Sequence, residues 1–250
     1  MRLQFLGANR QVTGSCYVLD VAGLRIMIDC GLFQERRFQA RNWAESPVPA
    51  SSIDYLLLTH AHLDHCGLIP RLVSQGFDRP IITVEPSVRL AEIIMLDAGR
   101  IQEEDASYKK RRHAKKKQQG RYPEIPLYTE DDAKQALSLL QAVRYGEPVS
   151  LNDEVTATFH EAGHILGSAI VELVVRSNGE SKSIVFSGDL GQWNKPLIRD
   201  PTLLDRAEVV VMELTCGDRN HTDGGDVESQ LTWISQIDSA AGRTVMCLAA

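Results

Sequence analysis

Length, composition and charge identify an ordinary globular chain and exclude several classes of protein. Its 250 residues suffice for one large buried core, and 43% apolar with 24% charged residues exclude disordered, collagen-like and coiled-coil proteins. The net charge of −6 does not by itself suggest a nucleic-acid binder. No run approaches the roughly 18 to 20 apolar residues that span a bilayer, and the polar start is unlike a secretory signal. We therefore expect a cytoplasmic protein that is not embedded in a membrane.

The first third of the chain predicts short strands separated by glycine-containing turns. Residues 2–6, 15–21 and 24–29 are apolar stretches of this kind, and their spacing is typical of a β-meander. The run DYLLLT at 54–59 is almost continuously apolar, which indicates a strand buried on both faces. We expect a helix over 67–76.

The remainder predicts helices followed by strands. Helical periodicity covers 86–104 and 130–142, and the second segment is introduced by TEDD, an N-cap with acidic residues in the first turn. Two strand-rich halves with helices between and after them predict a layered α/β sandwich. The further elements that we expect are strands over 154–160, 168–175, 183–189, 208–214 and 243–250, and a helix over 226–240.

The cysteines and one basic segment each allow a simple interpretation. The cysteines are odd in number and lack CxxC spacing, so we expect reduced side chains rather than disulfides or a thiolate zinc site. They are Cys16, Cys30, Cys66, Cys216 and Cys247. The segment KKRRHAKKKQQGR at 109–121 carries eight Lys or Arg and no acid. A solvated loop or helix face and a phosphate-binding patch both remain open for it.

The stretch LLLTHAHLDHCG places three histidines and an aspartate within six positions. If the preceding strand continues, His60 and His62 share one face while Ala61 points away, and Asp64 and His65 lie on the turn into the next helix. Without a cation, this grouping would leave several polar groups unsatisfied or repelling one another. The motif therefore predicts a metal site.

Two further groups occur in matching contexts, each after a strand and beside a glycine turn. These are His164 in FHEAGHILGS and Asp189 in IVFSGDLG. Ligands of open α/β sheets collect beyond the carboxyl ends of strands, so we expect both groups to meet the first cluster. The expected site holds two divalent ions, for which these ligand types favour zinc, with manganese and iron as alternatives. His60, His62 and His164 would hold one ion, Asp64 and His65 the other, and Asp189 would bridge both.

These motifs, preceded by Asp29 in IMIDCG, resemble in kind and order the metallo-β-lactamase superfamily of binuclear zinc hydrolases. Within it, the chain resembles the β-CASP branch of RNA-processing nucleases. The resemblance implies an αββα sandwich over residues 1–250, incomplete at the C-terminus and ending where a β-CASP cap domain would begin. The phrases that carry it are FLGANRQVTGSCYVLD, CGLFQ, HLDHCGLIPRLVSQGF, IQEEDA, PLYTEDDA, GHILGSA and VVMELTCGDRNH.

The resemblance also implies roles for individual residues. The six residues above would be metal ligands, Asp29 would orient a ligand imidazole, and Asp29, Asp64 and Glu213 would form the catalytic set. Leu214 and Cys216 depart from the Ser and Tyr of the branch. Two later histidines of the branch, which complete the second metal site and help protonate the leaving group, have no counterpart here. We therefore expect metal binding with weak or no nuclease turnover.

Three functions remain in competition. The leading interpretation is a binuclear-metal-dependent hydrolase of RNA phosphodiester bonds, with RNA bound by the metal cleft and by residues 109–121. The alternatives are a hydrolase of small esters, thioesters or lactones in the same superfamily, and a non-catalytic RNA-binding subunit. The presence of all six ligands favours chemistry over binding alone. The sequence leaves open whether cleavage is internal or terminal and whether the chain is a homo-oligomer.

Overall fold

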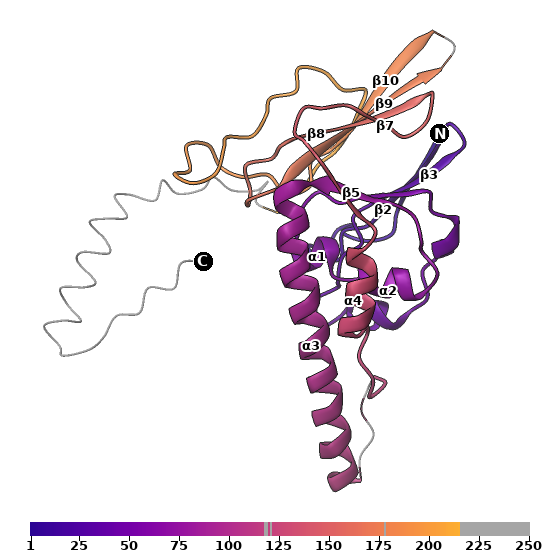
Figure 1. Cartoon of the computed structure of the whole chain (residues 1–250), viewed down its shortest axis with the longest axis vertical. Helices are drawn as coiled ribbons and strands as arrows, with labels where there is room; N and C mark the ends of the chain where they lie inside the picture. The colour runs from indigo at the N-terminus through magenta and orange to yellow at the C-terminus, as the bar shows by residue number, and fades with distance from the viewer. Residues whose placement is uncertain (118–119, 121, 178, 216–250) are drawn as a thin grey trace, which may run out of the picture. The chain divides into compact units, whose positions relative to one another are not determined.

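A computed structural model describes residues 1–117, 120, 122–177 and 179–215. Met1–Glu213 form one compact unit and Leu214–Ala250 a second. The first unit contains two stacked β-sheets, with helices against the outer face of one of them (Figure 1). No helix within the described ranges combines the length and apolar character needed to cross a membrane.

The first sheet has the strand order β1-β2-β3-β4-β5-β6. Strands β1 to β3 are antiparallel, which confirms the predicted meander, and β3 to β6 are parallel. β4 has neighbours on both sides and buried faces, which explains its continuous leucines. The strands are β1 (Arg2–Phe5), β2 (Tyr17–Val21), β3 (Leu24–Ile28), β4 (Tyr55–Leu57), β5 (Ile81–Val84) and β6 (Leu140–Val143).

The second sheet has the order β11-β10-β9-β8-β7 and is antiparallel except for the parallel pair of β10 and β11. Four of its strands were predicted, whereas the short β7 and the buried β5 of the first sheet were not. The strands are β7 (Val149–Ser150), β8 (Val155–Glu161), β9 (Ala169–Ser177), β10 (Glu180–Phe186) and β11 (Val209–Val211).

Alternating residues of the first sheet supply two separate cores. Leu57 and Ile82 face the second sheet and pack with Phe159 and Phe186. Their neighbours Leu56, Leu58 and Ile81 face the helices instead and pack with Leu72, Met95 and Ala133. Because side chains alternate along a strand, each central strand contributes to both cores.

The helices are α1 (Leu63–Cys66), α2 (Ile69–Ser74), α3 (Glu85–Lys116) and α4 (Glu130–Leu137), with short 3₁₀ turns at Gln39–Trp43 and Ala50–Ser52. The predicted N-cap of α4 is confirmed as a capping box between Thr129 and Asp132. The predicted helix over 130–142 is wrong beyond Leu137, because residues 140–143 form β6 and pair with β5. A parallel sheet edge overrides the local helical preference there.

Helix α3 is longer than the predicted 86–104 and takes in most of the basic segment. Its second half contains the pairs Arg100–Glu104 and Lys109–Asp105, spaced by four residues, and its last turn is basic. Both features suit a helix, because such pairs are neighbours on its surface and cations are favoured near its C-terminus.

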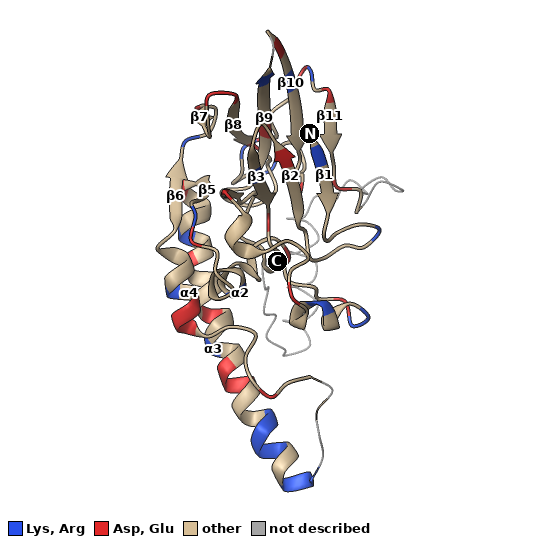
Figure 2. Cartoon of the chain, turned by 90° about the vertical axis from the view of Figure 1, so that its right-hand side faces the viewer, with Lys and Arg blue, Asp and Glu red and all other residues tan. Residues whose placement is uncertain are grey.

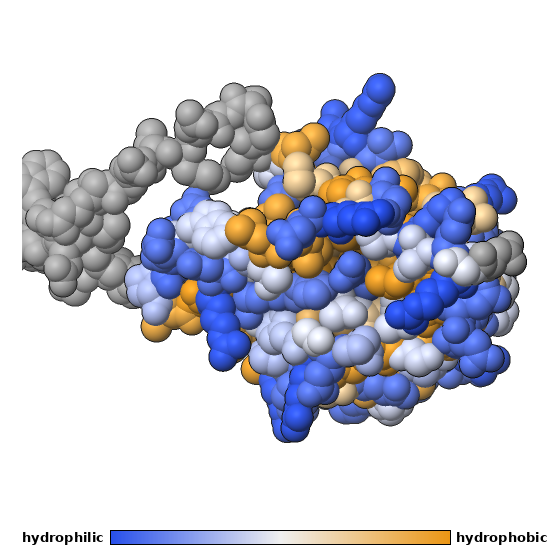
Figure 3. Space-filling model, turned by 90° about the horizontal axis from the view of Figure 1, so that it is seen from above, coloured by the Kyte–Doolittle hydropathy of each residue, from blue (hydrophilic) through white to orange (hydrophobic). Residues whose placement is uncertain are grey.

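One layer of the predicted αββα sandwich depends on residues that the structure does not describe. The expected helix over 226–240 and strand over 243–250 lie outside the described residues. The segment 187–208 packs Leu190, Leu204 and Ala207 against the second sheet. It also exposes apolar side chains such as Trp193 and Leu197, and Figure 3 shows hydrophobic patches among hydrophilic ones on the face seen from above.

Cys16, Cys30 and Cys66 are free thiols; the other two cysteines lie outside the described residues.

Candidate metal centre

Loops after three strands bring the predicted ligands together. His60 and His62 follow β4, His164 follows β8 and Asp189 follows β10. The expectation that the strand continues through the first two histidines is wrong, because β4 ends at Leu57 and His62 is the N-cap of α1. The expected directions nevertheless hold: Ala61 is buried in the helix-side core, while the two imidazoles converge with ring centres 4.8 Å apart.

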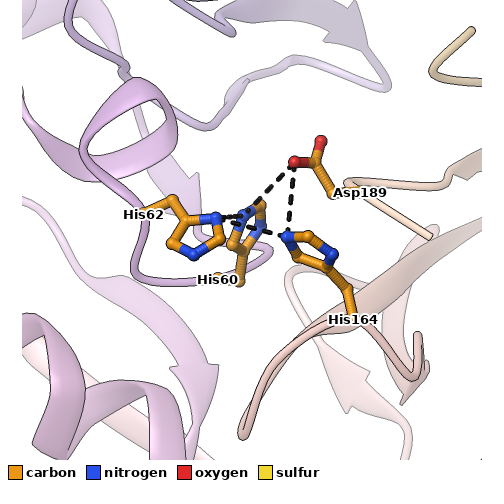
Figure 4. A group of neighbouring side chains, drawn as sticks. All are labelled: His60, His62, His164 and Asp189. Carbon is orange, nitrogen blue, oxygen red and sulfur yellow. Dashed lines mark hydrogen bonds and ion pairs between the residues drawn. The ribbon is translucent and has the colours of Figure 1, made fainter. Parts of the chain in front are cut away.

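Three imidazoles and one carboxylate surround a common point (Figure 4). His62 Nδ1 lies 3.1 Å from His60 Nε2 and 3.2 Å from His164 Nε2. Asp189 Oδ2 lies 3.8 Å from His60 Nε2 and 3.6 Å from His164 Nε2, and all four atoms lie within 4.8 Å of one another. Four ligands arranged tetrahedrally around zinc would be roughly 3.3–3.6 Å apart. The group therefore fits a divalent cation.

The pKa shifts of His60, His62 and Asp189 also suit a cation. Burial, followed by the neighbouring histidines, lowers the pKa of His60 well below its ordinary value, and burial and His164 lower the pKa of His62. Burial acts to raise the pKa of Asp189, but the hydrogen bond and charge of His65 outweigh it and lower that pKa. Neutral imidazoles beside an ionised carboxylate are the forms that bind metals.

A second set of groups lies on the other side of Asp189. His65 Nε2 is 3.2 Å from Asp189 Oδ1 and 4.0 Å from Asp64 Oδ2. The two oxygens of Asp189 therefore face different histidines, as a bridging carboxylate would require. Ser15 Oγ is also 3.4 Å from His65 Nε2. This second set is looser than the first.

Asp29 is buried beneath the cluster and accepts three hydrogen bonds. His65 Nδ1–H donates to Asp29 Oδ2 at 2.7 Å, and Thr59 donates to the carboxylate through both its backbone N–H and its hydroxyl, each at 2.8 Å. Burial acts to lower the pKa of His65, but the Asp29 and Asp189 carboxylates outweigh it and raise that pKa to about 10 in the metal-free chain. The bond to Asp29 directs His65 Nε2 towards Asp64 and Asp189.

Thr59 is a site residue that the sequence argument missed. Besides binding Asp29, its hydroxyl lies 3.1 Å from His60 Nδ1, so it connects the histidines of both clusters. Ser168 supports His164 in a similar way, because its hydroxyl accepts the backbone N–H of His164. Both residues lie within the motifs that the sequence singled out, and for Thr59 a hydroxyl directly before a buried histidine was the available signal.

Glu213 contacts the loop that carries Asp189. Its carboxylate accepts the backbone N–H of Leu190 at 3.2 Å, and its own N–H donates to Ser187 Oγ at 3.1 Å. Glu213 therefore contacts residues on both sides of Asp189 along the chain, and it restrains the loop that carries Asp189.

Close backbone contact also joins the loops of His164 and Asp189. Gly191 N–H donates to Ala162 O at 2.9 Å. A Cβ at Gly191 would lie 1.5 Å from the carbonyl oxygen of Gly163, so no larger residue fits without moving the loop. This glycine is what lets the two ligand-bearing loops touch.

Two curated relatives are similar to this chain over most of its length. The chain is 36% identical to Ribonuclease TTHA0252 of Thermus thermophilus over 221 residues, which are 88% of this chain and 45% of that relative. It is 30% identical to Transcription termination factor FttA of Methanocaldococcus jannaschii over 221 residues, 87% of this chain and 32% of the relative. The chain thus spans less than half the length of these curated relatives.

One solved structure and one family model also match parts of this chain. The solved structure of BJP-1, a subclass B3 metallo-beta-lactamase of Bradyrhizobium japonicum, covers 70% of this chain and 55% of its own, with 22% identity and a TM-score of 0.40. The family described as the Metallo-beta-lactamase superfamily matches residues 9–208, which include all six predicted ligands. The names of the sequence relatives agree with the RNA-processing branch that the motifs resemble. The chain therefore belongs to the metallo-beta-lactamase superfamily.

Proposed function

We propose that this chain is the metal-binding part of a hydrolase that cleaves RNA phosphodiester bonds with two divalent ions, preferentially zinc. The observation that carries the proposal is the convergence of four ligand atoms within 4.8 Å of one another from three separate loops. The ribonuclease and termination-factor names of the relatives support RNA as the substrate class over small esters.

Two sets of residues would hold the ions. His60, His62 and His164 would bind the first, Asp64 and His65 the second, and Asp189 would contact both. Bound divalent ions supply Lewis acidity, which activates a water molecule and neutralises charge on phosphate oxygens.

The other residues of the site act on these ligands. Asp29 and Thr59 hold His65 and His60 in orientation through the hydrogen bonds described above. Glu213 restrains the loop of Asp189 through the Leu190 N–H. We assign Asp64 to the reacting centre as a ligand, and Asp29 and Glu213 to positioning.

The basic segment 109–121 supplies a second RNA contact in this proposal. Its described part, residues 109–117, forms the end of α3, where Figure 2 shows lysines and arginines gathered beyond an acidic stretch. Phosphate contacts of this kind release counterions, so RNA affinity should fall with salt. We place the activity in the cytoplasm, where thiols such as Cys16, Cys30 and Cys66 stay reduced.

The test combines metal content with cleavage. The wild-type chain, dialysed against zinc and then against metal-free buffer, should retain zinc by elemental analysis, and His62→Ala should lose it. Single-turnover assays with excess protein and labelled RNA should show slow, chelator-sensitive cleavage that His62→Ala abolishes. Unchanged zinc in the variant would reject the metal site. Hydrolysis of a chromogenic ester without any cleavage of RNA would instead assign the chain to the hydrolases of small esters, thioesters or lactones.

A further inference from the structure

A groove of about 1270 Å³ connects the metal cluster with the basic end of α3. At one end it is lined by His62 and Asp64, which belong to the cluster. At the other end it is lined by Lys109 and Arg112 of the basic segment. One continuous surface therefore joins the two regions to which the proposed function assigns RNA.

One face of α3 forms a wall of this groove. The lining residues Ile94, Ala98, Ile101, Asp105 and Arg112 recur at intervals of three, four or seven, as positions on one helical face do. Neighbouring residues on other faces of the same helix lie outside the groove lining, including Ile93, Lys110 and Arg111. The helix thus presents two basic surfaces, and only one of them faces the groove.

The middle of the groove is suited to bases rather than to phosphates. Ile101 and Ile125 line it with 46% and 61% of their surface exposed, and Trp43 adds an aromatic ring. Large apolar side chains left open to solvent in a groove favour a ligand with flat or apolar groups. The faces of unpaired bases are such groups.

Two acidic residues of the groove, Asp97 and Asp105, form ion pairs with cations of α3, and Glu124 contacts an imidazole. Asp97 pairs with Arg100, Asp105 with Lys109, and Glu124 with His113. Among the described residues Arg112 has no carboxylate within ion-pairing distance, so its charge is available to an anion. Open positive charge at the far end therefore comes from Arg112, and Lys109 adds to it by exchanging its exposed partner Asp105 for a phosphate.

We infer that this groove guides a single RNA strand from the metal cluster to Lys109 and Arg112, so that affinity depends on strand length. The inference rests on the proposed function. Ile94 and Arg112 are separated by about 27 Å along the helix, at about 1.5 Å per residue. At about 3.4 Å per nucleotide, the spacing along one strand of a DNA duplex, about eight nucleotides span the distance.

The test measures binding with cleavage prevented. Labelled single-stranded RNAs of four to sixteen nucleotides, with cleavage-resistant phosphorothioate linkages, are titrated with the zinc-loaded full chain, and fluorescence anisotropy gives the affinity. For the wild-type chain, affinity should rise steeply up to about eight nucleotides and then level off. The four-nucleotide RNA should bind weakly, because it cannot reach from the cluster to the cations.

Charge-reversal variants on the two faces of α3 separate the groove from general electrostatics. Lys109→Glu with Arg112→Glu should weaken binding of long RNA by about tenfold and reduce its salt dependence by about 0.7 per lost contact. Within the segment 109–121, the inference confines the RNA contact to the groove face of α3, which carries Lys109 and Arg112. Lys110→Glu with Arg111→Glu changes the net charge equally, on the same turns but away from the groove, and should weaken binding less than about threefold. Equal losses in the two pairs would overturn the inference.

A second matched pair tests the apolar wall. Ile101→Glu should weaken binding of long RNA, whereas Ile93→Glu should not, because Ile93 is exposed on α3 but does not line the groove. Circular dichroism melts of all variants establish that the fold is retained.

The outcomes distinguish the inference from the proposed function. Cleavage of RNA by the wild-type chain, together with length-independent binding or equal effects of paired variants, overturns the groove and leaves the hydrolase. A duplex that binds as tightly as the single strand, with the same dependence on Lys109 and Arg112, also overturns the groove. A wild-type chain that neither binds nor cleaves RNA of any length rejects both.

Discussion

The metal cluster and the basic end of α3 are both rich in titratable groups, yet different forces hold them. In the cluster, His60, His65 and Asp29 are buried, and hydrogen bonds from several loops fix their positions. At the end of α3, the charged side chains are mostly exposed and are supported by pairs within the same helix. The first region depends on tertiary structure and tolerates little change, whereas the second is a local structure whose surface charges contribute little to stability.

The largest expected effect on stability comes from removing the Asp29 carboxylate, which accepts the hydrogen bonds of the buried network. Asp29→Ala should lower the free energy of unfolding by about 3–5 kcal/mol, because it leaves His65 and Thr59 buried without their acceptor. Urea denaturation monitored by circular dichroism gives the value. A loss below about 1 kcal/mol would mean that water replaces the carboxylate. The metal cluster would then be as insensitive to substitution as the exposed end of α3.

Metal binding should strengthen the same region. Zinc at a hundred times its dissociation constant should raise the stability of the wild-type chain by about 2.7 kcal/mol, because the ligands converge only in the folded chain. Thermal denaturation with and without zinc measures this gain. His164→Ala should remove most of it. The same gain in that variant would place zinc elsewhere on the chain.

A single hydroxyl gives a finer test of the network. Thr59→Val keeps the side-chain volume and the backbone bond to Asp29 but removes the hydroxyl bonds to Asp29 and His60. We expect a loss of about 1–2 kcal/mol in stability and a 10- to 100-fold weaker zinc affinity, measured by chelator competition. Thr59→Ser restores the hydroxyl and should recover the affinity. Failure of that rescue would contradict the role given to Thr59.

The smallest effect is expected at the exposed end of α3. Lys110→Glu with Arg111→Glu should change the free energy of unfolding by less than about 0.5 kcal/mol, because surface charges are screened by solvent. The same urea titration used for Asp29→Ala measures it. A loss as large as that of a buried residue would show that the end of α3 is packed against another part of the chain.

The sequence predicted an element of the fold correctly where its residue pattern was compatible with only one kind of structure. The meander, the buried strand β4 and the capping box of α4 have strong local signals, and the structure has all three. The helix expected through residue 142 failed because Leu140–Val143 carries no local mark of the strand with which it pairs. The length of α3 was underestimated because charged pairs, rather than an apolar stripe, continue it.

By itself, the sequence singled out the titratable side chains that the structure brings together, but not the hydroxyls of Thr59 and Ser168 beside them. The spacing HAHLDH, the two later glycine-flanked ligands and Asp29 were recognisable because few arrangements other than a metal site place such groups together. Only the tertiary structure decided how they act: the two oxygens of Asp189 face different histidines, Thr59 connects both clusters, and one face of α3 lines the groove. The physical reason is that these relations depend on distances between segments far apart in the chain, which packing sets and local residue preferences do not.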